Sequence, residues 1–132
     1  MKKTKLLNAA LSHLVAQLGH NDVVVVGDAG LPVPPGVPCI DLAVMRGLPS
    51  IALVLEALES EMQVERMVMA KETFFANQGE TPGWLPAPWR DLPIEQVSHE
   101  VFKQRNAQAR AVIRTGECTP YANVMLVAGV AF

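Results

Sequence analysis

A run of four consecutive valines at residues 23–26 constrains the fold of this chain more than any other feature. β-Branched residues favour strands, and a strand without polar alternation is typical of one that is covered on both faces. Sheets made of such strands are parallel or mixed and carry helices on both sides. We therefore expect a central buried strand in a layered α/β fold.

Apolar spacing and turn residues divide the rest of the chain into helices, strands and loops. A first helix is expected to end near Leu18, before Gly19. The further predicted elements are helices over residues 51–58 and 99–109 and strands over residues 39–44, 61–70, 94–99, 111–115 and 123–132. Residues 77–93 are rich in proline and glycine, which predicts a surface loop without regular structure whose two tryptophans pack onto the body or a neighbour. The sequence thus predicts one α/β domain, residues 1–132, with a mostly parallel sheet covered by helices.

The composition indicates self-association and argues against several classes of partner. Half of the residues are hydrophobic and 18% are charged, so we expect a homo-oligomer that covers surplus apolar surface. The net charge of -2 comes from interspersed signs without a basic block, which argues against nucleic-acid binding. The longest uncharged apolar run, residues 124–132, is too short to cross a membrane.

The termini and cysteines favour a cytoplasmic protein. Polar residues interrupt the apolar stretch of the first helix, which argues against a signal peptide. Cys39 and Cys118 have neither metal-ligand spacing nor the companions of a disulfide framework. We expect both to be reduced, partly buried thiols.

Two ionisable residues flank the valine strand and are candidates for chemistry. His20 follows the helix-terminating Gly19, and an imidazole titrates near neutrality, so it is a candidate acid or base; an exposed turn histidine is the alternative. Asp28 stands at the carboxyl end of the strand, where open α/β sheets bind ligands, although an aspartate beside glycine also caps turns. Eight extended residues span roughly 26 Å, so the two side chains meet in one chain only if the turn folds back. Otherwise a neighbouring chain must contribute one of them.

A second group of polar residues lies near the end of the sequence. In "TPYANV", an extended backbone would direct Tyr121 and Asn123 to one side, where they form a polar grip, while Ala122 offers only its backbone. A purely structural role at a strand entry is the alternative. His99 is placed to cap a helix or to reach a ligand, and His13 is expected at the surface of the first helix. Phosphate-binding loops, nucleophilic triads, zinc motifs and the dinucleotide fingerprint are all missing.

Several longer stretches resemble the D-ribose pyranase family, which is related to the L-fucose mutarotases. They are "LGHNDVVVVGDAGLPVP", "EMQVE", "SHEVFK" and "AVIRTGECTPYANVMLVAGVAF", and the similarity runs through nearly the whole chain. The "DAGLP" and "PYAN" motifs resemble the ribose branch more than the fucose branch. Residues 74–93 depart from the family pattern, because relatives have more helical sequence where this chain has its proline and tryptophan loop.

The resemblance implies an assignment of roles and an assembly. His20 becomes the acid/base residue, and the sugar contacts become Asp28, His99, Tyr121, Ala122 and Asn123. The family is cytoplasmic, uses no metal or cofactor, and forms rings, decamers by this resemblance, with sugar sites between neighbouring subunits. A site between subunits would bring His20 of one chain close to Asp28 of the next, although the two are far apart within one chain.

The implied reaction is the interconversion of pyranose and furanose forms of free D-ribose by acid/base ring opening and reclosure. A histidine that exchanges protons near neutrality suits this chemistry, since no redox step occurs. Two alternatives remain open: a fucose-type mutarotase, and a non-catalytic sugar-binding module in which His20 only binds.

Overall fold

The valine run forms β1 (Val23–Gly27), and other strands flank it on both sides. In the computed structural model, which describes residues 1–132, β5 (Ala111–Arg114) pairs with β1 in parallel and β6 (Val124–Ala128) pairs with it antiparallel. The other strands are β2 (Cys39–Asp41), β3 (Val64–Ala70) and β4 (Ile94–Val97).

The sheet is mixed and mostly parallel, as the sequence predicts. Its order is β2-β5-β1-β6-β3-β4. The pairs β1–β5, β2–β5 and β3–β4 are parallel, and only the two pairs that involve β6 are antiparallel. All parallel strands therefore end at the same edge of the sheet, where β6 begins.

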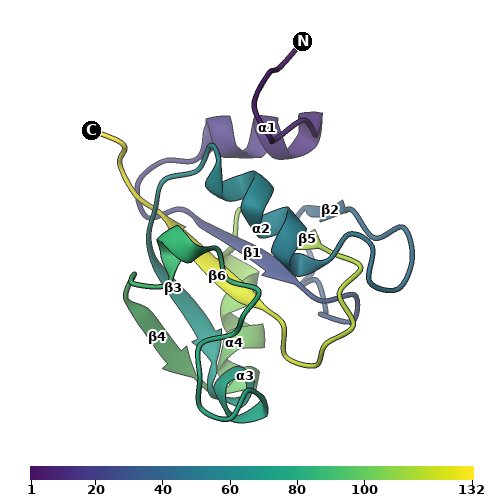
Figure 1. The fold of residues 1–132 in the computed structure, drawn as a ribbon, viewed down its shortest axis with the longest axis vertical. Coiled ribbons are helices and arrows are strands. Elements are labelled where there is room, and N and C mark those ends of the chain that lie inside the picture. The colour runs from purple at the N-terminus through teal and green to yellow at the C-terminus, as the bar shows by residue number, and fades with distance from the viewer.

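Helices cover both faces of the sheet, which explains the unbroken valine run. Figure 1 shows α1 (Ala9–Gln17) and α2 (Ile51–Glu59) on one face and α4 (His99–Arg105) on the other. Val24 and Val26 belong to the larger core cluster with the apolar residues of α1 and α2, whereas Val25 packs in a second cluster with Phe102 of α4. Because both faces are covered, Val24, Val25 and Val26 are all fully buried.

Each of these three helices begins at a polar cap. The side chains of Asn8, Ser50 and Ser98 each accept a backbone N–H three residues further on, at the starts of α1, α2 and α4. A cap of this kind satisfies a donor that the first helical turn leaves free. The first helix ends at Gln17 with Leu18 as its C-cap, which confirms the predicted end near Leu18.

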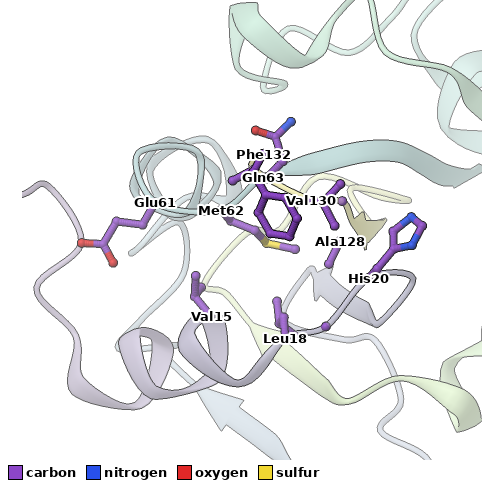
Figure 2. A pocket seen from close by; sticks show the side chains of 12 residues that line it. Val15, Leu18, His20, Glu61, Met62, Gln63, Ala128, Val130 and Phe132 are labelled. Atoms are coloured by element: carbon purple, nitrogen blue, oxygen red, sulfur yellow. The ribbon is translucent and has the colours of Figure 1, made fainter.

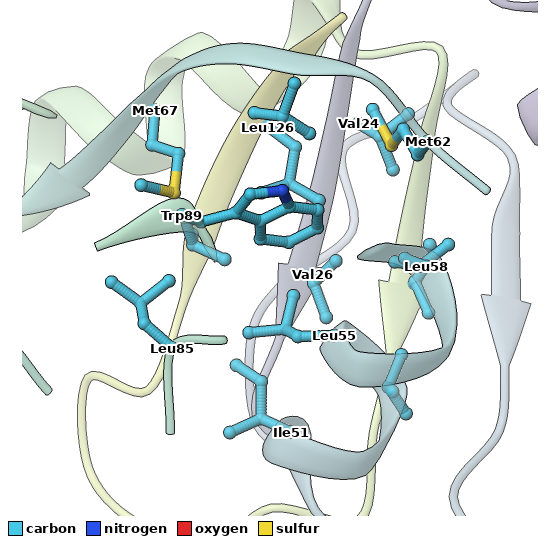
Figure 3. Packing of buried hydrophobic residues seen from close by; sticks show 14 of the residues in the cluster. Val24, Val26, Ile51, Leu55, Leu58, Met62, Met67, Leu85, Trp89 and Leu126 are labelled. Carbon is cyan, nitrogen blue, oxygen red and sulfur yellow. The ribbon is translucent and has the colours of Figure 1, made fainter. Parts of the chain in front are cut away.

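The proline-rich loop is more ordered than the sequence predicts. Residues 87–89 form one 3-10 turn, η1 (Ala87–Trp89), so the prediction of no regular structure is wrong there. Proline is tolerated at the first turn of a helix, which explains this turn. Trp89 is 4% exposed and packs among Val26, Leu55 and Leu126 (Figure 3), so the expected packing of the tryptophans onto the body is confirmed. The short helix α3 (Lys71–Ala76), directly after β3, has no counterpart among the predicted elements.

Several predicted elements are shorter in the structure. The predicted strand over 39–44 ends at Asp41, whose carboxylate accepts the Ala43 N–H and turns the chain. The predicted strand over 123–132 ends at Ala128, because Val127 already pairs with Val23, the first residue of β1. The predicted helix over 99–109 divides into α4 and a 3-10 turn, η2 (Asn106–Gln108). None of the helices has the length and hydrophobicity needed to span a bilayer.

Candidate active site

Asp28 and Asn123 form a hydrogen-bonded pair at the carboxyl end of β1. Asn123 Oδ1 accepts the backbone N–H of Asp28 at 2.9 Å, and Asn123 Nδ2 donates to Asp28 Oδ2 at 3.0 Å. The other carboxylate oxygen accepts the Gly30 N–H at 2.9 Å. Asn123 is 1% exposed, whereas Asp28 is half-buried. The carboxylate is therefore held in one orientation while part of it stays open to solvent.

Gly27 permits the close approach of Leu31 and Asn123 to the end of β1. A Cβ at that position would lie 2.5 Å from Leu31 Cδ2 and 2.9 Å from Asn123 Oδ1. Neither atom has room to move away, because Leu31 and Asn123 are buried. Only glycine lets the last residue of β1 pass between them.

Tyr121 lies in a tight turn, and the expected extended geometry of residues 121–123 is wrong. Its φ of 61° is left-handed, and Thr73 Oγ1 fixes its carbonyl by a 2.7 Å hydrogen bond. The turn points Asn123 inward and leaves the Tyr121 ring 38% exposed. Ala122 packs into the core, and its N–H donates to the Thr119 carbonyl, so this turn uses the backbone that was expected to face a ligand.

His99 lies beside Tyr121 at the start of α4. The two rings meet edge to face with centroids 5.1 Å apart, and the Phe102 ring stacks nearly parallel to the His99 ring with centroids 6.3 Å apart. The backbone N–H of His99 donates to Glu72 Oε2 at 2.9 Å. Hydrogen bonds from the backbone N–H groups of Glu72 itself and of His99 lower the pKa of the Glu72 carboxyl. His99 Nδ1 is buried without a hydrogen-bond partner. The imidazole thus packs against two aromatic rings, and no hydrogen bond within the chain engages its buried Nδ1.

Glu117 ties the adjoining loops together. Its carboxylate accepts the N–H groups of Ile51, Cys118 and Thr119, and its carbonyl accepts the Ala29 N–H at 2.9 Å. Burial alone would raise the pKa of Glu117, but these hydrogen bonds, together with one from the Thr119 hydroxyl, lower it overall. The segment after Asp28 is therefore fixed to the end of β5 and the start of α2.

These contacts gather Asp28, His99, Tyr121 and Asn123 into one group, here called the carboxyl-end cluster. It provides a carboxylate, an imidazole and a phenol around the edge where the parallel strands end. Hydrogen-bonding groups of this variety, beside an aromatic ring, suit a polyhydroxylated ligand.

His20 lies at the opposite end of the sheet. It precedes β1, whereas Asp28 follows it, and the five residues of that strand alone span roughly 17 Å. The His20 side chain is 51% exposed, and its Nε2 lies 3.0 Å from Glu65 Oε2. The turn does not fold back along the strand, so His20 does not join the carboxyl-end cluster within one chain.

A cavity of about 410 Å³ opens beside His20. Its lining comes from the end of α1, the residues before β3 and the residues that follow β6. Figure 2 shows Met62 and the Phe132 ring in the middle of this lining, with His20 at one side and Glu61 at the other. His20 and Glu61 are the only lining side chains that ionise, and of these two residue types only histidine normally titrates near neutrality.

Sequence reasoning missed four residues that support these groups: Glu65, Glu72, Thr73 and Glu117. Glu65 had a detectable signal, because Glu65 and Arg66 are consecutive polar residues that break the alternation of the predicted strand. The other three act through contacts that are distant in sequence, which local patterns do not reveal.

The remaining histidine and the cysteines lie outside both groups. His13 is exposed on α1, as expected. Cys39 and Cys118 are free, but both are exposed, so the expectation of partly buried thiols is wrong. Cys39 belongs to the short edge strand β2, whose residues are largely exposed, and Cys118 belongs to a surface loop.

Comparisons with known proteins give full-length matches. The model of the RbsD / FucU transport protein family matches residues 1–131. The D-ribose pyranase of Paracidovorax citrulli is 57% identical over 134 residues, and that of Variovorax paradoxus is 53% identical over 133 residues. Each match covers 100% of both chains.

Solved structures share the fold. Bacillus subtilis RbsD complexed with D-ribose has a TM-score of 0.91 and 48% identity, with 100% of both chains covered. The fucose mutarotase of Streptococcus pneumoniae in complex with L-fucose has a TM-score of 0.74 at 20% identity, over 100% of both chains, and so shares the fold alone. The family and fold expected from the sequence motifs are confirmed: this chain belongs to the RbsD / FucU transport protein family.

Proposed function

We propose that this chain is a D-ribose pyranase, an isomerase that interconverts the pyranose and furanose forms of free D-ribose without a cofactor or metal. The observation that carries the proposal is the full-length similarity to proteins of that name at 57% and 53% identity. The D-ribose complex of the Bacillus subtilis relative supports the choice of sugar.

The reaction moves two protons and exchanges one carbon–oxygen bond. The anomeric hydroxyl loses its proton, the bond between the anomeric carbon and the ring oxygen breaks, and the ring oxygen is protonated. The hydroxyl on carbon 4 then attacks the aldehyde carbon and gives up its proton, while the aldehyde oxygen takes up a proton and becomes the anomeric hydroxyl of the furanose. A group that donates and later accepts a proton near neutrality serves both halves, which is the role we assign to His20.

The carboxyl-end cluster supplies the sugar contacts in this proposal. Asp28 oxygens accept sugar hydroxyls through the lone pairs that Gly30 and Asn123 leave free. The exposed face of Tyr121 packs against the apolar side of the sugar, and His99 offers its ring Nε2, since Nδ1 is buried. Asn123 and Ala122 contribute by shaping the cluster, since both side chains are buried.

A complete site in this proposal needs two subunits. The opposite locations of His20 and the carboxyl-end cluster support a homo-oligomer in which His20 of one subunit faces the cluster of the next. A closed ring completes every such site, and the family resemblance favours a decamer in the cytoplasm. Exposed apolar side chains, among them Val44, Met45 and Leu53, are available for the contacts between subunits.

Saturation-transfer NMR on equilibrated sugars tests the function directly. Catalytic amounts of the protein should speed pyranose–furanose exchange of D-ribose far more than exchange of L-fucose or D-galactose. Faster exchange of fucose would identify a mutarotase of the fucose type instead. Ribose binding without faster exchange would identify a non-catalytic sugar-binding module.

A further inference from the structure

Glu65 is the extra residue of a β-bulge beside the His20 turn. In the pairing of β3 with β6, Val64 lies opposite Ala128 and Arg66 lies opposite Val127, so Glu65 has no partner of its own. The bulge also explains why Val64 and Met67, three residues apart, both belong to the larger core cluster. Bulges redirect side chains and are frequent next to active sites. Here the redirected side chain reaches His20.

The contact between Glu65 and His20 has a defined polarity. Glu65 Oε2 lies 3.0 Å from His20 Nε2, and an ionised carboxylate only accepts hydrogen bonds. The proton of a neutral His20 imidazole therefore lies on Nε2. Nδ1 is then the nitrogen that remains for a proton of the substrate. The other carboxylate oxygen of Glu65 lies 3.9 Å from Arg66 Nε.

The backbone around the pair is fixed by hydrogen bonds. Asn21, with a left-handed φ of 69°, donates its N–H to the Ala128 carbonyl at 2.9 Å, and the Ala128 N–H donates to the Asp22 carbonyl at 2.8 Å. Asp22 also accepts the Gly19 N–H through its side chain at 2.8 Å. The turn that carries His20 is thus held to the end of β6 through Asn21 and Asp22, and Gly19 before His20 is tied to Asp22.

Gly129 provides the space that the Glu65 side chain occupies. A Cβ on Gly129 would lie 3.0 Å from Glu65 Cβ and 3.5 Å from Oε2. Because the first distance is tighter than ordinary van der Waals contact, any larger residue would displace the Glu65 side chain.

We propose that Glu65 is a positioning residue for the isomerisation. It orients the His20 imidazole, fixes its tautomer with the proton on Nε2, and leaves Nδ1 to exchange protons with the sugar. A carboxylate that orients a histidine in this way is a recurring arrangement in active sites. This inference rests on the proposed function, in which His20 is the acid/base residue.

Nitrogen-15 NMR of the imidazoles tests the contact without any substrate. In the native protein at a pH where His20 is neutral, its Nε2 should carry the proton. Glu65→Gln should move the tautomer equilibrium toward Nδ1–H, because a carboxamide also donates to Nε2, and His13 and His99 should keep their signals. Glu56→Gln, which changes an exposed carboxylate on α2 paired with Lys5, is the matched control. Unchanged His20 signals in Glu65→Gln would overturn the proposal.

Exchange kinetics test the consequence for turnover. Glu65→Gln should lower kcat about 10- to 100-fold and leave KM within roughly twofold, because the variant changes the orientation of the acid/base group and not the sugar contacts. Glu65→Asp, which keeps a carboxylate on a shorter stem, should recover part of the loss. Gly129→Ala should lower kcat in the same direction without a change of assembly.

A double variant separates this inference from the function on which it rests. Glu65→Gln should have no further effect in a His20→Ala background, since Glu65 acts through His20. Equal effects in both backgrounds would contradict the positioning role. A native protein that fails to speed ribose exchange would refute the proposed function, while the nitrogen-15 signals would still decide whether Glu65 sets the tautomer.

Discussion

The two ends of β1 differ in how firmly their functional side chains are held. At the carboxyl end, Asp28 is fixed on both oxygens and Tyr121 through its carbonyl. At the amino end, the His20 side chain is half-exposed and has one polar contact, to Glu65. In the proposed function, the carboxyl end is therefore prepared to recognise the sugar within a single subunit, whereas the amino end presents the proton-exchanging group outward.

This difference indicates how the work is divided in the proposed enzyme. Recognition of several hydroxyls needs fixed partners, because each mobile side chain would lose conformational entropy on binding. Proton transfer needs one group that reaches the reacting atoms from another direction. In the proposed ring, the placement of the two groups at opposite ends of one strand would make every subunit contribute to two sites.

The largest expected effect comes from His20→Ala. We expect ribose exchange to fall about 10²- to 10⁴-fold, the usual contribution of a general acid/base, while the fold and assembly stay intact because His20 is outside the core. Saturation-transfer NMR measures the loss, and circular dichroism with light scattering checks the fold and assembly. Native exchange rates in a folded variant would remove His20 from the mechanism and refute the proposed division of roles between the two ends of β1.

Asn123→Ala should disrupt the carboxyl end alone. The change removes both hydrogen bonds to the half-buried Asp28 and leaves its N–H without this partner, so ribose binding should weaken by about 1 to 3 kcal/mol. Titration calorimetry measures the affinity, and the His20 signals in nitrogen-15 NMR should not move. Native affinity would mean that Asp28 keeps its orientation without this partner.

Mixed assemblies sharpen the comparison, because they test whether the two ends meet across subunits. His20→Ala subunits, which lack the acid/base group, and Asn123→Ala subunits, which bind ribose weakly, are mixed in equal amounts and assayed at a ribose concentration too low to saturate the Asn123→Ala site. About a quarter of the contacts in a head-to-tail ring then join two intact ends. Exchange activity should recover to that level once native mass spectrometry shows that subunits have mixed. Mixed rings without recovered activity would locate the whole site in one chain.

The smallest expected effect is the acid sensitivity of the carboxyl end. Hydrogen bonds from the backbone of Glu72 and from His99 lower the Glu72 pKa below its usual value of about 4.5. The charged carboxylate therefore stabilises the folded state fully above that value, and the stabilisation is lost as the pH falls through the lowered pKa. Thermal unfolding at a series of acidic pH values should show a weaker pH dependence in Glu72→Gln than in the native protein. Glu59→Gln, on α2 and outside both ends, is the control and should match the native curve.

The sequence predicts the parts of this molecule that local patterns determine. The valine run predicts a strand buried on both faces, and Gly19 predicts the end of the first helix. Asp28 lies at the carboxyl edge where parallel strands end, and His20 lies in a turn before the same strand, as their positions in sequence suggest. Their separation was visible in advance, since it follows from strand geometry alone.

Other parts depend on contacts that no local pattern contains. Tyr121 adopts a left-handed conformation that is rare for an aromatic residue, and the Thr73 hydrogen bond that holds it comes from a distant helix. Asn123 turns inward because Asp28, 95 residues away, satisfies its amide. The roles of Glu72 and Glu117 likewise depend on tertiary hydrogen bonds.

The central location of β6 has a consequence for how the chain folds during synthesis. This strand lies between β1 and β3, so it joins the β2-β5-β1 half of the sheet to the β3-β4 half. The ribosome makes residues 124–128 after every other strand, and until then the two halves have no strand to connect them. Both halves meanwhile expose an unpaired strand edge, a feature that favours aggregation of a nascent chain.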